Sequence, residues 1–103
     1  MILGVVVTDF NQAKNAINVM REALNRKWTV NCFLTDDGVC MIEGPDFLDM
    51  AKNEDTHFSF ICEHSVERFC KDVNLEELAK FVVIGGQYQN AELVHNSDRV
   101  LVF

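Results

Sequence analysis

Basic residues are scarce in this sequence. Nine lysines and arginines stand against sixteen aspartates and glutamates, so the formal net charge is -7 at pH 7. This charge repels polyphosphate at long range, and the sequence has no stripe of lysine or arginine that could neutralise a phosphate backbone. We therefore expect no nucleic-acid partner.

The sequence also lacks a long apolar run. The N-terminal segment Ile2–Val7 is too short to cross a bilayer, and no basic region precedes it as in a secretory signal peptide. We therefore predict a cytoplasmic location and no membrane partner. The length of 103 residues suits a single domain over residues 1–103 and leaves the faces of a layered fold thinly covered, which favours oligomerisation.

Short cysteine motifs are missing as well. The four cysteines, Cys32, Cys40, Cys62 and Cys70, include no Cys-x-x-Cys pair, and their spacing to the three histidines does not match structural zinc sites. Without an export signal, a disulfide framework is not expected. Cys70 would lie about 12 Å beyond Cys62 along an ideal helix, which is too far for a bond between them. We interpret Cys32, Cys40 and Cys70 as structural, and expect no metal and no cofactor.

Strand-like and helix-like segments alternate along the chain. Ile2–Thr8 has the continuous apolar character of a strand buried on both faces. Helical spacing then relates four apolar residues, Ala13, Ile17, Met20 and Leu24. Further strands are predicted at 28–35, 58–62, 81–84 and 99–103, and further helices around 47–51, 65–71, 75–80 and 91–94. The alternation predicts an α/β fold, a three-layer α/β/α sandwich with a five-stranded, mainly parallel sheet.

Four strand-to-helix segments converge at one edge of such a sheet. They are Thr8–Phe10, Thr35–Gly38, Cys62–His64 and Gly85–Tyr88. The Gly85-Gly86 pair lacks the G-x-G-x-x-G pattern of a phosphate-binding loop, so we interpret it as a tight turn. Chemistry in this fold is expected at this edge, and Cys62 is its only thiol.

Two interpretations of Cys62 are open. At the amino end of a helix, backbone N–H groups and the helix dipole favour a reactive thiolate. Glu63 and Glu67 add negative charge that opposes a thiolate. Cys62 also shares helical spacing with Val66 and Phe69, so a helix that began earlier would place the thiol in the core as a small apolar residue.

Other polar residues at this edge allow weaker hypotheses. His64 could exchange a proton with Cys62, although a histidine in a surface helical turn is usually only solvated. Asp9, Asp36 and Asp37 could form an acidic magnesium pocket like that of a phosphorylated receiver domain. Such a domain has a phosphoacceptor aspartate after its third strand, where this chain has Cys62. We therefore interpret the aspartates as turn and capping residues.

Four parts of the sequence resemble one known family. They are the apolar first strand, the segment Phe33–Val39, Cys62 with Arg68 six positions later, and the closing segment Ala91–Phe103. In these parts the chain is similar to the DsrE-like sulfur-relay proteins, which include the DsrE, DsrF and TusD subunits. It departs from the family at Phe69, where a glycine commonly follows the arginine.

The resemblance implies a three-layer sandwich with a five-stranded parallel sheet, assembled as a homo-oligomer (dimer, trimer or hexamer) or a hetero-oligomer. It also implies that Cys62 carries sulfur as a persulfide between a donor protein and an acceptor protein, a sulfurtransferase-like role. We predict a small cytoplasmic persulfide carrier with Cys62 as the sulfur-bearing residue and His64 as its candidate proton partner. The alternative is a non-catalytic oligomer subunit or interaction module of the same fold with an inert Cys62.

Overall fold

The computed structural model describes residues 1–53, 56–70, 73–80 and 82–103. The strands are β1 (Ile2–Val7), β2 (Thr29–Leu34), β3 (Thr56–Cys62), β4 (Ile84–Gly85) and β5 (Arg99–Val102). The α-helices are α1 (Ala13–Asn25), α2 (Pro45–Ala51), α3 (Glu63–Phe69), α4 (Leu75–Leu78) and α5 (Gln87–Asn96). Two 3-10 helices, η1 (Phe10–Gln12) and η2 (Asp36–Glu43), follow β1 and β2.

The strands form one sheet in the order β4-β3-β2-β1-β5, and every neighbouring pair is parallel. The central pair β1 and β2 is in register from Ile2 opposite Thr29 to Val7 opposite Leu34. β1, β2 and β3 have six, six and seven residues, whereas β4 has two and β5 has four. The body of the sheet is therefore three parallel strands with a short strand at each edge.

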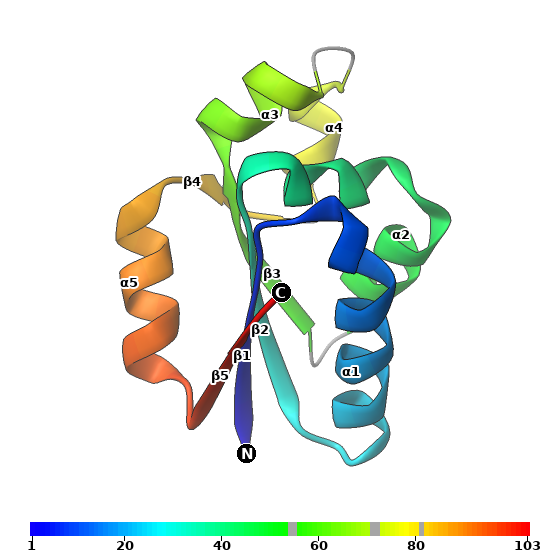
Figure 1. The fold of residues 1–103 in the computed structure, drawn as a ribbon, viewed down its shortest axis with the longest axis vertical. Coiled ribbons are helices and arrows are strands. Elements are labelled where there is room, and N and C mark those ends of the chain that lie inside the picture. Colours follow the sequence, from blue (N-terminus) through cyan, green and yellow to red (C-terminus); the bar gives the residue numbers. More distant parts are fainter. Residues whose placement is uncertain (54–55, 71–72, 81) are drawn as a thin grey trace.

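The predicted three-layer α/β/α sandwich with a five-stranded, mainly parallel sheet is corrected by this arrangement. The fold is α/β and the strands are parallel, but only three of them have substantial length. The helices do not make two equal layers: α1 and α2 cover one face, α5 alone lies against the other, and α3 and α4 lie beyond one end of the sheet (Figure 1). A chain of 103 residues is too short to cover both faces fully.

Most of the predicted elements are confirmed with small shifts of their ends. The helix predicted from the spacing of Ala13, Ile17, Met20 and Leu24 is α1; the first three side chains are buried and Leu24 is half-buried. The strand predicted at 81–84 is wrong for Val82 and Val83, because β4 begins at Ile84, and residue 81 lies outside the described residues. The segment Asp36–Glu43, where neither a helix nor a strand was predicted, forms the 3-10 helix η2.

The sheet separates the buried apolar side chains into two clusters. Alternate residues of β1 face opposite sides, so Val5 and Val7 belong to one cluster and Val6 to the other. The α1-side core comprises Leu3, Val5, Val7, Ala13, Ala16, Ile17, Met20, Ala23, Val30, Cys32, Leu34, Val39, Met41, Ile42, Phe47, Met50, Val66, Cys70 and Val82. The α5-side cluster comprises only Val6, Phe33, Cys62 and Leu93, with Val100 packed against it.

Two glycines bring helices close to β1. A Cβ at Gly38 would overlap the backbone carbonyl of Val7, so only glycine lets η2 approach the end of the strand this closely. On the other face, a Cβ at Gly4 would lie 2.6 Å from Ser97 Oγ and 2.8 Å from Leu93 Cδ2. Gly4 thus makes the space that brings Leu93 and the end of α5 onto the sheet.

Candidate functional site

The loops that follow β1, β2, β3 and β4 lie at one edge of the sheet, as predicted. Val7 is opposite Leu34, and Cys62 is opposite Gly85, so these strand ends are neighbours. The N–H of Phe103 donates to Val6 O at 2.8 Å, and its carbonyl accepts from Thr8 N at 2.7 Å. These two bonds continue the pairing of β5 with β1 at the switch point of the sheet, where open parallel sheets often bind ligands.

Cys62 is the last residue of β3 and directly precedes α3. Its backbone is extended, with φ -67° and ψ 115°, and the helix begins at Glu63. The hypothesis that a helix starting earlier carries Cys62 on its apolar face is therefore wrong. The thiol is nevertheless only 8% exposed, because it packs in the α5-side cluster with Phe33 and Leu93.

The first turn of α3 is held by the loop after β2. The backbone N–H of Asp36 donates to Ser65 Oγ at 2.9 Å, and Asp36 has a positive φ of 49° that is unusual for a residue other than glycine. His64 is exposed, whereas Cys62 is buried. No hydrogen bond is recorded between these two side chains in the described part of the chain, so their predicted pairing stays a prediction.

Asp9 and Asp37 serve as capping and turn residues, as interpreted from the sequence. Asp9 Oδ1 accepts from Asn11 N at 2.9 Å, and Asp37 Oδ1 accepts from Phe10 N at 2.8 Å, so both carboxylates are used to hold η1. Within residues 1–53, 56–70, 73–80 and 82–103, no three His, Cys, Asp or Glu side chains are grouped so that they could hold a metal ion.

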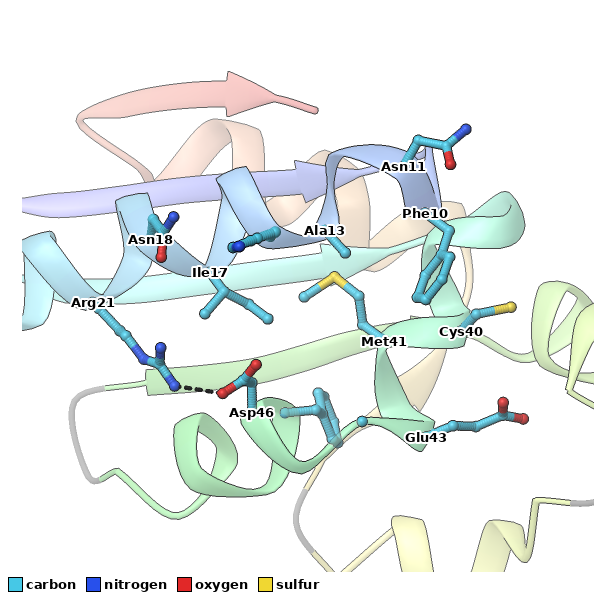
Figure 2. Close-up of a pocket in the computed structure, with 13 residues that line it drawn as sticks. Phe10, Asn11, Ala13, Ile17, Asn18, Arg21, Cys40, Met41, Glu43 and Asp46 are labelled. Carbon is cyan, nitrogen blue, oxygen red and sulfur yellow. Dashed lines mark hydrogen bonds and ion pairs between the residues drawn. The ribbon is translucent and has the colours of Figure 1, made fainter.

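A cavity of about 630 Å³ lies between α1 on one side and η2 and α2 on the other (Figure 2). Ile17, Met41 and Phe47 contribute apolar surface to it. Arg21 and Asp46 make an ion pair of 2.7 Å that joins α1 to α2 at this cavity. Its volume and mixed lining are typical of small-molecule sites, but no residue at the predicted edge lines it apart from Phe10.

Cys40 and Cys70 form a thiol pair that the sequence did not indicate. Their Sγ atoms are 3.6 Å apart, with Cys40 on η2 and Cys70 capping the C-terminus of α3. Burial, the neighbouring Cys40 and the carboxylate of Glu43 together raise the pKa of Cys70 to about 12. Burial alone raises the pKa of Cys32, which has no exposed surface.

No short motif could have revealed this pair. The two cysteines are separated by thirty positions, and their approach depends on η2 packing against α3. No helix or strand was predicted at Cys40, so the sequence indicated no direction for that side chain. Both residues had been interpreted as structural, each by itself.

Comparison with models of known protein families gives no match, and comparison with curated proteins gives none. The similarity to DsrE-like proteins therefore stays a prediction. Among the described residues, no helix combines the length and the apolar character that a membrane crossing needs.

Proposed function

We propose that this protein carries sulfur as a persulfide on Cys62. The observation that carries the proposal is the position of Cys62 at the β3–α3 junction, at the edge where functional loops of a parallel sheet gather. The other three cysteines lie within β2, within η2 and at the C-terminus of α3. The partners would be a donor protein and an acceptor protein, each offering a cysteine.

The transfer is an exchange at sulfur. The Cys62 thiolate attacks the terminal sulfur of a donor persulfide, a new S–S bond forms at Cys62, and the donor leaves as a thiolate. In the second step an acceptor thiolate attacks the terminal sulfur on Cys62 and releases the Cys62 thiolate. No electrons are gained or lost overall, so the reaction needs neither a metal nor an organic cofactor.

The cover over Cys62 has to move before a partner thiol can reach it. Leu93 is the one buried residue among the described side chains of α5, so this helix is held to the sheet by little apolar surface. Segments with few buried contacts open locally at low free energy. Displacement of α5 by a partner would expose Cys62, and its return would keep water from the persulfide.

The test is to incubate the reduced protein with cysteine and a cysteine desulfurase and then to measure the intact mass and map the modified peptide. We expect the mass of one sulfur atom to be added at Cys62. The Cys62→Ser variant should take up no sulfur, whereas Cys32→Ala, a matched change at a fully buried cysteine, should load normally. Normal loading of Cys62→Ser would overturn the proposal.

Burial of Cys62 favours a second candidate, an interaction module in which this cysteine is inert. β5 is an edge strand whose outer side has no strand partner among the described residues, and it exposes Leu101 and Val102, the latter by 68%. An exposed apolar edge strand can pair with a second copy of the chain. If iodoacetamide modifies Cys62 in the folded protein no faster than Cys32, and Val102→Lys lowers the molar mass in light scattering, the module is favoured over the carrier.

A further inference from the structure

The thiols of Cys40 and Cys70 lie within contact distance of each other. We infer that these two residues form a reversible disulfide by reducing a small-molecule disulfide, at a site separate from Cys62. Their Sγ atoms are 3.6 Å apart, and a disulfide needs about 2.05 Å, so the two sulfur atoms have to approach by roughly 1.5 Å. This displacement is within the reach of side-chain rotation together with a small shift of a short 3-10 helix.

The two elements that bring the thiols together are fixed by other contacts. The backbone N–H of Asp36, at the start of η2, donates to Ser65 Oγ in α3 at 2.9 Å. At the other end of α3, the N–H of Cys70 donates to Val66 O at 2.8 Å, and Val66 is buried in the α1-side core. The approach of the sulfur atoms therefore follows from the packing of η2 against α3 and does not depend on the thiols themselves.

The two thiols differ in access. Cys40 is half-buried and Cys70 is only 3% exposed, so an incoming disulfide reaches Cys40 first. Cys40 is one of the residues that line the cavity between α1, η2 and α2, and Figure 2 shows its sulfur on the side of η2 away from Ile17. The Cys40 sulfur therefore lies at the edge of this cavity, where η2 packs against α3.

The reaction balances as two exchanges. The Cys40 thiolate attacks one sulfur of the small disulfide, forms a mixed disulfide and releases one small thiolate. The Cys70 sulfur then attacks the sulfur of Cys40 and releases the second small thiolate. The Cys70 proton leaves with the second small thiolate, which is released as a thiol. Two protein thiols are oxidised to one disulfide while one small disulfide is reduced to two thiols.

Burial favours this order of events. Cys70 is only 3% exposed, and its burial, with smaller contributions from Cys40 and Glu43, raises its pKa, so Cys40 attacks first. Once Cys40 is part of a mixed disulfide, the Cys70 sulfur already lies beside its target. Cys40 is thus the attacking residue and Cys70 the resolving residue.

The test uses the reduced full chain with an excess of oxidised glutathione at neutral pH, followed by acid quenching and peptide mapping without reductant. We expect the wild type to lose the mass of two hydrogen atoms and to yield a peptide joined through Cys40 and Cys70. Cys70→Ser should stop at a glutathione adduct on Cys40. Cys40→Ser should leave Cys70 unmodified, with total thiol oxidation slowed by about tenfold or more.

Controls separate this inference from the sulfur-carrier proposal. Cys62→Ala removes the proposed sulfur carrier and should still form the Cys40–Cys70 crosslink at the wild-type rate. A crosslink that includes Cys62, or a Cys40→Ser variant that oxidises as fast as the wild type, would overturn the inference. If the serine variants do not fold, as judged by circular dichroism, the wild-type time course decides: the glutathione adduct on Cys40 must appear before the crosslink.

Discussion

On one face of the sheet, α1, α2 and η2 enclose the α1-side core, whereas on the other face α5 contributes one buried residue, Leu93, among its described side chains. The same strands supply both faces, because alternate residues of β1 and β2 point to opposite sides. The difference therefore comes from the helices. One face is closed by several elements that support one another, and the other depends on a single helix.

Because the two faces differ in this way, the cysteines lie in two different environments. Cys32 and Cys70 belong to the α1-side core, and Cys40 packs against it. Cys62 belongs to the α5-side cluster, where a single helix has to move to expose it. A thiol covered by several elements and a thiol covered by one helix have similar exposed fractions. The free energy needed to expose them to a reagent differs, because one helix can move alone.

The largest expected effect comes from truncating the α1-side core. Met20→Ala should lower the free energy of unfolding by about 3 to 4 kcal/mol, because the surrounding elements cannot collapse onto the vacated space. Leu93→Ala should lower it by only about 2 kcal/mol, because α5 can shift toward the sheet. Urea unfolding of the two variants measures both values.

The same two variants can also be compared by the rate at which iodoacetamide labels Cys62. Leu93→Ala removes the cover from Cys62 and should increase its rate of iodoacetamide labelling in the folded protein by about tenfold. Met20→Ala should leave that rate unchanged under conditions where it stays folded. Equal labelling in the two variants would mean that the two faces open together, and the distinction between them would not hold.

A smaller effect is expected from each unit of pH above 9. The pKa of Cys70 rises from 9.0 to about 12 on folding, through burial and the neighbouring Cys40 and Glu43. Its contribution to stability is complete below pH 9 and is lost as the pH rises toward 12, because the unfolded chain ionises this thiol first. The free energy of unfolding should fall by up to about 1.4 kcal/mol per pH unit for this group.

The measurement is urea unfolding under reducing conditions at neutral pH and at two values above 9. Cys70→Ala should lose stability less steeply with pH than the wild type. A residual slope is expected in this variant, because burial also raises the pKa of Cys32 in the same core. Parallel slopes in the wild type and the variant would show that Cys70 does not carry the dependence.

The sequence predicted elements well where one physical signal was strong. Ile2–Val7 is apolar throughout, and Asn74 Oδ1 accepts from the N–H groups of Glu76 and Glu77 at 3.0 and 3.3 Å, as expected for a residue that caps a helix. The start of β4 was predicted too early, because an apolar run does not show which of its residues will pair with the neighbouring strand. η2 was missed because a 3-10 helix has no long apolar periodicity.

In the candidate sites, too, features set by neighbouring residues could be predicted, whereas features set by tertiary contacts could not. The strand-to-helix position of Cys62 could be predicted, because it depends on neighbouring residues. Its cover by Leu93 could not, because that contact depends on how α5 returns across the sheet and on the space left by Gly4. The Cys40–Cys70 pair likewise depends on tertiary packing alone.

The smallest expected effect concerns the ion pair that joins α1 to α2. Arg21 and Asp46 are 2.7 Å apart with side chains 46% and 52% exposed, so water and salt screen most of their attraction. Arg21→Ala should lower the free energy of unfolding by about 0.2 to 1 kcal/mol, and a double-mutant cycle with Asp46→Ala measures the coupling. Arg26→Ala is the control, since Arg26 is the C-cap of α1 and pairs with Glu22 of that same helix. If the Arg21–Asp46 coupling reached the loss seen for Met20→Ala, an exposed charge pair, and not the α1-side core, would be what closes this face.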